Sequence, residues 1–511
     1  MKPLLAGLRP GRVDALLIAA GAAIRLRQYL AGFSLEVSEA QLSLNLIARG
    51  YADLLRPLDL DQAAPIGFLW IERAMIDLFG SGELALRAFP TFCGIASLFL
   101  FRALARRVVS PFATHVGLGL FAVSPFLVSH ANHVKQYSSD VATTLLLLLL
   151  AHRAMTRGYD RVSVAALGAV GALALWLSHP AVFVLGGIGL VWTANLRAAL
   201  APVAVCGTLW AASFGALYGV SLRHFAHNDF LSSYWGNAFM PLPPRSIGDL
   251  GWFQEAFFGT FRDPGGFLAP GLAGALSLIG IVALARRSRT LVVLLVSSIV
   301  LALLASGLGR FPFAGRVILF LMPMLLIFLG AGIDHVRELT WRTTPAVTVV
   351  LLGVLAFDPV VTGILRFLRP RPECDARAVV AHVGERIQPG DGVYLYSDAT
   401  SLFRYYAPRF GLEGVPLVIG TSAESNHRDA VADLDGLMGR PRVWLVFAHV
   451  HNRDGHPTEE EFFLFELGRR GRQLDAFRSV DASAYLYDLA APPPTGAVGT
   501  RPDGAAAEPS A

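Results

Sequence analysis

The chain has 511 residues, of which 54% are hydrophobic and only 16% are charged, and its formal net charge is +5. Soluble globular proteins carry about 25% charged residues, so this composition excludes an ordinary soluble domain and indicates a polytopic membrane protein. A modest positive charge is typical of cytoplasmic loops and indicates no nucleic-acid partner. The three cysteines are widely spaced and predict neither a disulfide framework nor a zinc site.

Apolar segments recur along most of the chain. A spanning helix needs roughly 20 apolar residues, and about eleven segments approach that length. They are 13–33, 84–105, 113–130, 141–157, 162–178, 181–196, 198–220, 269–285, 290–308, 315–333 and 345–364. The first is interpreted as an uncleaved span rather than a signal peptide. His179-Pro180 predicts a tight turn between two spans. The fold class expected is mainly α.

Arginine clusters all fall on one side of the membrane if the chain crosses it about eleven times. Cytoplasmic loops are enriched in Lys and Arg, so this side is expected to be the cytoplasm. The clusters are Arg9 and Arg12; Arg102, Arg106 and Arg107; Arg153, Arg157 and Arg161; Arg197; Arg286, Arg287 and Arg289; Arg337 and Arg342. A transmembrane domain at 1–368 then has a cytoplasmic N-terminus, and its loops 34–83 and 221–268 face outward with the C-terminal region.

The loop 34–83 is too polar for lipid and is rich in carboxylates. Ser38 with Gln41 predicts a capping box at the start of a first interfacial helix, and Gly50 a stop. Pro65 predicts the first turn of a second helix that ends at Gly80. Carboxylates this dense at a membrane surface suggest an active site.

Glu39 is the first candidate for a general base, because sugar transfer from a lipid phosphate requires deprotonation of the incoming hydroxyl. Its alternative role is to complement a helix N-terminus. Glu36 is the second candidate. Asp59, Asp61 and Gln62 could bind substrate hydroxyls or a divalent cation, or form a solvated turn.

Glu72 is a further substrate-binding candidate that could instead pair with Arg73 or with a Lys or Arg of another loop. Arg73 and Asp77 predict an ordinary helix ion pair. The second outward loop places Lys135, Tyr137 and Asp140 where a span emerges. Lys135 beside Tyr137 could hold a phosphate. Asp140 favours either a substrate role or the cap of the next helix.

Arg310 and Arg316 lie in another outward turn, and Arg316 opens a span, where a lone cation is unfavourable unless it pairs or snorkels. A polyprenyl phosphate is a natural partner for a guanidinium. Arg25 and Arg27, near the outer end of the first span, could likewise pair with a polyprenyl phosphate or snorkel, and snorkelling is favoured.

Residues 372–490 alternate apolar runs with polar helical stretches, which predicts a three-layer α/β domain. Strands are expected at 393–397, 442–450 and 483–489, and helices at 376–387 and 459–471. The Pro/Gly/Ala-rich tail, 491–511, is expected to be disordered.

The chain resembles the GT-C membrane glycosyltransferases, in the bacterial family 39 branch related to protein O-mannosyltransferases and aminoarabinose transferases. The resemblance covers roughly residues 13–490 and is carried by an ordered set of motifs. These are SEAQLSLNLIARG (38–50), PLDLDQAAPIGFLWIE (57–72), FGSGELALRAFP (79–90), VKQYSSDVA (134–142), FPFAGRVILFLMPM (311–324) and RVWLVFAH (442–449).

The resemblance implies an enzyme of the bacterial cytoplasmic (inner) membrane with a periplasmic C-terminal domain. It implies transfer of a sugar, with inversion, from a polyprenyl-phosphate donor to a glycan, lipid or protein acceptor outside. Arg316, Lys135 and Arg310 are then expected to bind the donor phosphate. The family's Asp-Glu pair corresponds to Ser38 and Glu39 here, so Glu39 or Glu36 must serve as the base. No cofactor is certain, and a divalent metal stays open.

Two other interpretations are open. A catalytically inactive polyprenyl-lipid-binding scaffold is favoured by Ser38 in place of the family Asp. A transporter or flippase predicts buried mid-span charges and paired broken helices, whereas the charges here cluster at span ends.

Overall fold

The computed structural model describes residues 10–194, 196–223, 233–420, 427–450 and 458–490. The chain forms two compact units. The membrane unit comprises Met1–Gly32 and Asn45–Arg371, and the α/β unit comprises Phe33–Leu44 and Pro372–Ala511. The tail 491–511, for which disorder is predicted, lies outside the described residues.

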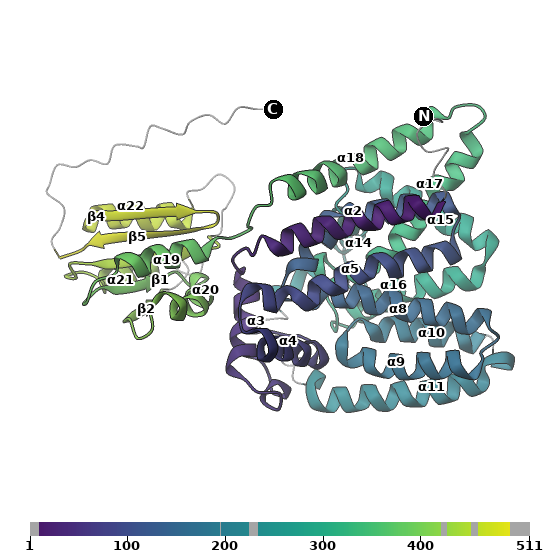
Figure 1. Cartoon of the computed structure of the whole chain (residues 1–511), viewed down its shortest axis with the longest axis horizontal. Helices are drawn as coiled ribbons and strands as arrows, with labels where there is room; N and C mark the ends of the chain where they lie inside the picture. Colours follow the sequence, from purple (N-terminus) through teal and green to yellow (C-terminus); the bar gives the residue numbers. More distant parts are fainter. Residues whose placement is uncertain (1–9, 195, 224–232, 421–426, 451–457, 491–511) are drawn as a thin grey trace. The chain divides into compact units, whose positions relative to one another are not determined.

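Each predicted apolar segment is helical, and the helices pack side by side in the membrane unit (Figure 1). Their bounds are α2 Pro10–Leu30, α5 Glu83–Val108, α6 Pro111–Val123, α7 Pro125–Ser129, α8 Tyr137–Thr156, α9 Arg161–Leu177, α10 Ala181–Ala194, α11 Leu196–Leu217, α15 Pro270–Arg287, α16 Arg289–Gly307, α17 Met322–Thr340 and α18 Ala346–Leu368. Among the described residues, 6 helices are long and apolar enough to cross a membrane alone, and a bent pair would bring the number to 7. The number of spans therefore stays a prediction, whereas a multi-pass membrane protein is confirmed.

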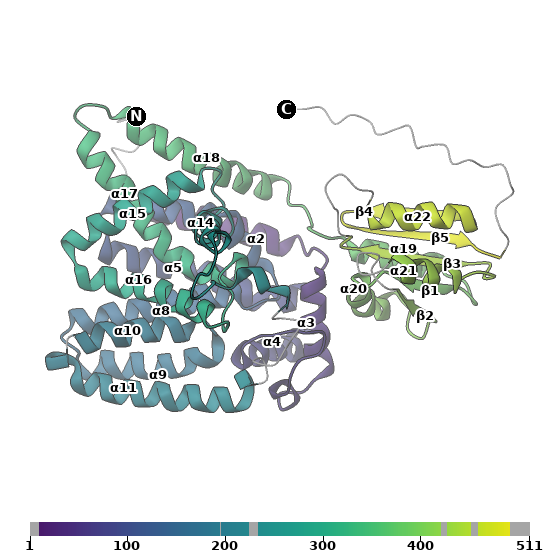
Figure 2. The same ribbon diagram turned by 180° about the vertical axis from the view of Figure 1, so that it is seen from behind.

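Shorter helices occupy the loops of the membrane unit. α4 (Ile66–Phe79) follows Pro65 and ends at Gly80, whose φ of 83° suits glycine. α14 (Ile247–Arg262) is seen nearly end-on in Figure 2, whereas the long helices run across the picture. The remaining short elements are η1 Asp53–Leu55, η2 His130–Asn132, η3 Tyr218–Leu222, η4 Gly236–Ala238 and η5 Gly315–Leu321.

The first helix of the opening loop, α3 (Val37–Ala48), begins one residue before Ser38. Ser38 is therefore inside the helix and cannot be its N-cap, so the predicted capping box with Gln41 is wrong. The stop near Gly50 is confirmed, because α3 ends two residues earlier. Arg73 of α4 then donates hydrogen bonds to the carbonyls of Leu46 (3.0 Å) and Arg49 (3.2 Å) at the end of α3.

A proline break shapes the segment that leads to the loop before α8. α6 and α7 are separated by a 56° bend at Ser124-Pro125. Pro125 has no N–H, so the carbonyl of Phe121, four residues earlier, loses its helical donor. Arg25 is 1% exposed and donates to the carbonyls of Phe121 (3.2 Å) and Ala122 (2.9 Å). The prediction that Arg25 snorkels is therefore wrong. Arg25 is buried in the unit and supplies hydrogen-bond donors to the carbonyls at the helix break.

Small residues bring the backbones close around this segment. A Cβ at Gly94 of α5 would lie 2.4 Å from the Cβ of Ala131 in η2. The Thr91 hydroxyl, on the same helix, donates to the Ala131 carbonyl at 3.1 Å. Helices in membranes pack through such small residues because no hydrophobic force draws them together in lipid. The contact fixes η2, and with it the loop that follows.

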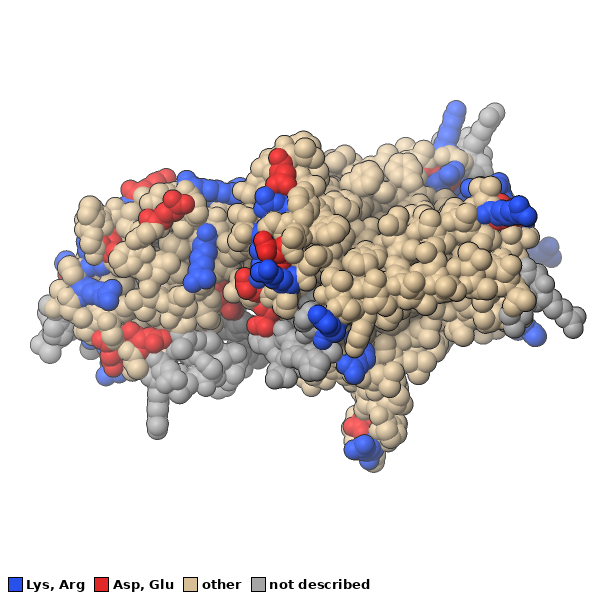
Figure 3. All heavy atoms as spheres, turned by 90° about the horizontal axis from the view of Figure 1, so that it is seen from below, with Lys and Arg blue, Asp and Glu red and all other residues tan. Residues whose placement is uncertain are grey.

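Charged side chains are sparse over much of the membrane unit. The face in Figure 3 includes a broad area without Lys, Arg, Asp or Glu, as a lipid-facing surface requires. The basic residues in the last turns of α5, α8, α15 and α17 are named here the arginine-rich end. It comprises Arg106 and Arg107 of α5, Arg153 of α8, Arg286 and Arg287 of α15, and Arg337 of α17.

The α/β unit contains one sheet with the order β2-β1-β3-β5-β4. β1 is parallel to both β2 and β3, and β5 is antiparallel to β3 and β4. The strands are β1 Gly392–Leu395, β2 Leu417–Ile419, β3 Val443–Ala448, β4 Arg472–Ser479 and β5 Ala482–Asp488. The three strands predicted from the sequence are β1, β3 and β5, which are buried along almost their whole length.

Helices cover both faces of this sheet, as the predicted three-layer domain requires. Phe463 of α22 contacts the rings of Tyr394 and Phe447 on one face. His382 of α19 stacks on Phe477 on the other, with ring centroids 4.5 Å apart. The helices of this unit are α19 Ala376–Arg386, α20 Ala399–Tyr406, α21 His427–Asp435 and α22 Glu459–Arg470, with the short turn η6 Ala407–Phe410.

Candidate active site

The predicted site residues are divided between the two units. Glu36 and Glu39, the candidate bases, lie in Phe33–Leu44 and belong to the α/β unit. The other candidates belong to the membrane unit: Asp59, Asp61, Gln62, Glu72, Lys135, Tyr137, Asp140, Arg310 and Arg316.

Glu39 has a structural role at the start of α3. It lies in the first turn and is fully buried, and its carboxylate accepts a hydrogen bond from the backbone N–H of Glu36 at 3.0 Å. This bond is the second half of a capping box, made by the third helical residue to the residue before the helix. The alternative role foreseen for Glu39 is therefore present, and it does not exclude a second one.

The segment before α3 is held within the α/β unit by side chains far along the chain. The N–H of Leu35 donates to the Tyr406 hydroxyl at 2.8 Å. The Ser34 hydroxyl donates to Asp375 at 3.0 Å and accepts from the N–H of Arg377 at 3.2 Å. These bonds fix the backbone on which Glu36 and Glu39 stand.

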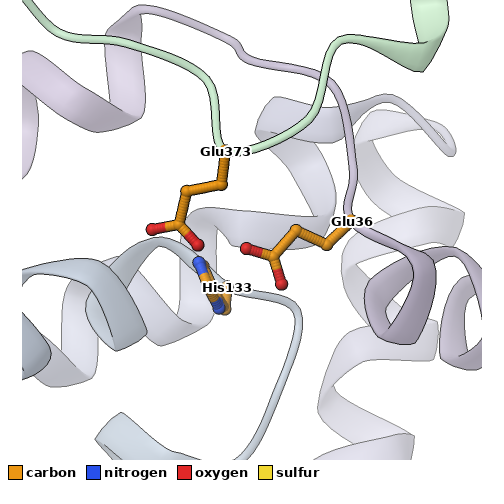
Figure 4. Close-up of side chains that lie close together, drawn as sticks. All are labelled: Glu36, His133 and Glu373. Carbon is orange, nitrogen blue, oxygen red and sulfur yellow. The ribbon is translucent and has the colours of Figure 1, made fainter. Parts of the chain in front are cut away.

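Glu36 lies close to a second carboxylate of its own unit. Its oxygens and those of Glu373 approach within 4.8 Å (Figure 4). The third side chain labelled there, His133, belongs to the membrane unit. Two carboxylates at this distance offer the oxygen ligands that a hard divalent cation prefers. The pair fits the metal that the sequence left open.

In the membrane unit, the loop between α3 and α4 meets the loop before α8 at Lys135. Lys135 is 7% exposed, and its ammonium donates to the side-chain carbonyl of Gln62 at 2.6 Å. Asp59 and Asp61, just before Gln62, are exposed. Asp59 pairs with Arg49 at 2.8 Å. The side chain of Gln62 therefore faces Lys135, whereas that of Asp61 lies at the surface.

Arg316 joins this group through Tyr137. Its guanidinium lies over the Tyr137 ring, 6.0 Å from the centroid. Asp263, which ends α14, is near enough to Arg316 for their charges to attract. Arg310, by contrast, has an exposed side chain. Gln62, Lys135, Tyr137 and Arg316 thus come together from three loops, and they are named here the cation cluster.

Glu72 and Asp140 are buried more deeply in the same unit. Neither oxygen of Glu72 has a hydrogen-bond partner among the described residues, and burial raises the pKa of Glu72 well above its usual value. Asp140 is the fourth residue of α8, whose N-cap is Gln136, so the predicted capping role of Asp140 is wrong. Its carboxylate instead lies near Ser178, which follows α9.

Cys93 of α5 connects the two carboxylates. Both Glu72 and Asp140 act electrostatically on its thiol. α4, α5, α8 and α9 therefore enclose a buried acidic centre. Ionisable groups inside a membrane bundle are costly and usually functional. Sequence reasoning proposed both carboxylates separately but did not foresee that they share one place.

Asp263 and Ser178 were missed by the sequence analysis. Asp263 stands before a proline in the loop 221–268, where no motif distinguishes it from a turn residue. Ser178 directly precedes the predicted His179-Pro180 turn, and its small polar side chain carries no helical or ligand spacing. Only the packing of α8 against α9 gives Ser178 a role.

Comparison with known proteins gives the fold its name. No protein-family model matches the chain, and no curated protein matches its sequence. Among solved structures, ArnT from Cupriavidus metallidurans in the apo state is similar with a TM-score of 0.54 at 13% identity, over 92% of this chain and 97% of that one. The fold is that of the GT-C glycosyltransferases.

Two further structures share this GT-C fold. ArnT from Cupriavidus metallidurans bound to undecaprenyl phosphate is similar with a TM-score of 0.52 at 14% identity, over 92% of this chain and 97% of that one. The apo oligosaccharyltransferase from Archaeoglobus fulgidus gives 0.50 at 10% identity, over 92% of this chain and 74% of that one. The GT-C fold predicted from the sequence is confirmed.

Proposed function

We propose that the protein is a membrane glycosyltransferase that moves a sugar from a polyprenyl-phosphate donor to an acceptor outside the cytoplasmic membrane of a bacterium. The cation cluster carries this proposal. It unites Lys135, Gln62, Tyr137 and Arg316 in the membrane unit. A protein of the same fold, ArnT, is known with undecaprenyl phosphate bound.

The cations suit the leaving group of the reaction. As the bond from the anomeric carbon to the donor phosphate breaks, the phosphate oxygen takes the electron pair and gains negative charge. Lys135 and Arg316 stabilise that charge with preorganised N–H donors. Gln62 orients the Lys135 ammonium through its carbonyl, and Tyr137 supports the guanidinium plane through a cation–π contact.

A carboxylate activates the acceptor, and Glu39 is proposed for this role, with Glu36 as the alternative. The acceptor hydroxyl gives its proton to the carboxylate while its oxygen attacks the anomeric carbon from the face opposite the phosphate. One C–O bond forms and another breaks, so the configuration is inverted. Glu72 and Asp140 are proposed to bind sugar hydroxyls, and Asp59, Asp61 and Arg310 the more exposed parts of the substrates.

The proposal also includes a bound divalent metal, an acceptor-binding role for the α/β unit and an orientation in the membrane. A divalent cation between Glu36 and Glu373 is expected to order the segment before α3, so a chelator should slow transfer in proportion to the metal lost. The α/β unit is proposed to bind a glycan, lipid or protein acceptor. The arginine-rich end faces the cytoplasm, and the α/β unit lies on the periplasmic side.

The test is transfer of a labelled sugar from a polyprenyl-phosphate donor in membrane vesicles containing the full chain. Lys135→Met and Arg316→Met should each lower the transfer rate by about a hundredfold, the loss typical when one stabilising donor is removed. Arg245→Met, which removes an exposed cation from the loop 221–268, is the matched control and should change the rate far less. Equal rates for all three variants and the wild type would contradict the assignment.

Glu39→Gln separates catalysis from helix capping. Glutamine can still accept the N–H of Glu36, as it does in natural capping boxes, but it cannot take a proton. Transfer should therefore be lost while the melting temperature stays unchanged. Normal transfer by Glu39→Gln with loss in Glu36→Gln would move the base to Glu36. Normal transfer by both variants would show that neither Glu36 nor Glu39 is the general base.

The inactive scaffold is the competing outcome. A wild-type chain that retains a labelled polyprenyl phosphate through purification, yet transfers no sugar with any acceptor extract, would be a lipid-binding protein without catalysis.

A further inference from the structure

A cavity of about 220 Å³ lies at the arginine-rich end, far along the helices from the cation cluster. Its walls come from three segments of the membrane unit: Val109 to Ala113, Ala283 to Arg287, and Ala331 to Glu338. These segments join α5 to α6 and end α15 and α17. The proposed transferase function uses none of them.

Close helix crossings create this cavity. A Cβ at Gly332 of α17 would lie 1.9 Å from the carbonyl oxygen of Leu276, so α15 and α17 touch through their backbones. A Cβ at Gly330 would lie 2.6 Å from the Ala113 oxygen of α6. In the next two turns, α17 carries Asp334 and Glu338 in place of glycine, and the cavity opens between the three helices.

The cavity has an apolar wall and a charged rim of both signs. Alanines 113, 283 and 331 form much of the wall. Arg286 and Arg287 bring positive charge from α15, and Asp334 and Glu338 bring negative charge from α17. The two signs are thus carried by two different helices.

The rim charges differ in how far they are already neutralised. Asp334 accepts two bonds from Arg337, at 2.9 and 2.7 Å, and one from the Ser110 hydroxyl. Among the described residues, Glu338 makes only a long contact of 3.7 Å, to Arg287, and both side chains are about half exposed. A loose surface pair of this kind is weak and exchanges readily for a ligand that offers both charges.

The position of the cavity indicates lipid rather than a soluble ligand. On α15, just before the cavity, Leu278, Ile279 and Val282 are 38% to 54% exposed. They form an apolar track that leads to the rim, where the lipid tails of a bilayer would lie. The arginines then stand at the height of the headgroups, where such side chains place their charge.

We propose that this cavity binds the headgroup of a zwitterionic phospholipid that carries a phosphodiester and a primary ammonium, as phosphatidylethanolamine does. Arg286 and Arg287 hold the phosphate, and Glu338 accepts hydrogen bonds from the ammonium. The acyl chains follow the exposed residues of α15. A phosphatidylcholine headgroup cannot donate such bonds, and phosphatidylglycerol lacks the cation.

The experiment measures calorimetric binding of dioctanoyl phosphatidylethanolamine, phosphatidylcholine and phosphatidylglycerol to the full chain in detergent. Phosphatidylethanolamine should bind at least about tenfold more tightly than the other two, a difference that one or two charged hydrogen bonds supply. Free phosphoethanolamine is titrated in parallel. Equal affinity for free phosphoethanolamine would overturn the assignment to a lipid, and equal affinity for the three lipids would overturn the site.

Variants locate the binding. Arg286→Gln with Arg287→Gln should abolish the preference, whereas Arg157→Gln with Arg161→Gln, which removes equal charge from the α8–α9 loop, should not. Ala283→Leu keeps every charge and should abolish binding by filling the cavity. Glu338→Gln should remove the preference for phosphatidylethanolamine over phosphatidylglycerol. Equal loss in both arginine pairs, or unchanged binding by Ala283→Leu, would contradict the proposal.

Discussion

The ammonium of Lys135 donates a 2.6 Å hydrogen bond to the side-chain carbonyl of Gln62, which lies 73 residues earlier in the chain. This bond ties the loop between α3 and α4 to the loop before α8. Lys135 is held nearly buried beside Tyr137, over which Arg316 lies. The proposed phosphate site of two cations therefore depends on a neutral amide for its geometry.

The bond between Lys135 and Gln62 predicts strong non-additivity. Gln62→Leu should lower kcat/KM for the donor about tenfold by releasing the ammonium, and Lys135→Met about a hundredfold. The double variant should match Lys135→Met alone, because Gln62 acts only through the lysine. Measured kcat/KM values of the four proteins give the coupling. Losses that multiply would show that Gln62 contacts substrate independently.

Arg25 should be essential for stability rather than for transfer. Arg25→Met leaves the carbonyls of Phe121 and Ala122 without their buried donor, which should cost roughly 1–3 kcal/mol for each group left unsatisfied. The melting temperature in detergent should fall clearly. Arg27→Met is the matched control two residues away, with an exposed side chain, and should melt like the wild type.

Glu72 should destabilise the protein increasingly as the pH rises. Its folded pKa is raised by burial, so between about pH 4.3 and that raised value the folded state binds more protons than the unfolded chain, and stability falls. Glu72→Gln should therefore raise the melting temperature at pH 8 and change it little at pH 4. An equal effect at both pH values would contradict the buried, neutral carboxyl.

Asp77, on the same helix, should have the opposite effect: its carboxylate stabilises the folded protein more as the pH rises. Hydrogen bonds from Arg73 and Tyr51 lower its pKa, so its contribution is present at neutral pH and disappears as the pH falls through the lowered value. Asp77→Asn should lower the melting temperature at pH 8 and have no effect in strong acid. The predicted Arg73–Asp77 pair is confirmed, at 2.8 Å.

Gly94 should tolerate no side chain. Gly94→Ala would place a methyl group 2.4 Å from the Cβ of Ala131 and push η2 away from α5. Both transfer and melting temperature should fall, because Lys135 follows η2 directly. Gly189→Ala in α10, with nothing within 4 Å, is the control and should melt at least as high as the wild type. A normal transfer rate in Gly94→Ala would show that the position of η2 does not affect the site.

Local sequence was a poor guide to helix ends and to edge strands. Ser38 and Asp140 both have good cap chemistry, yet α3 begins at Val37 and α8 at Tyr137, because tertiary contacts set where each helix starts. β4 was missed because its side chains are mostly exposed at the sheet edge, so it lacks the apolar run that marks β3.

The sequence by itself determined the helical membrane architecture and the central strands of the α/β unit, because a bilayer and a sheet buried on both faces impose their requirements directly on composition. Only the tertiary structure decided which polar groups meet. Arg25 finds Phe121 across 96 residues, and Glu72 shares a buried centre with Asp140. Such partners are chosen by helix packing and by the cost of leaving a polar group unsatisfied, and neither leaves a local pattern in the chain.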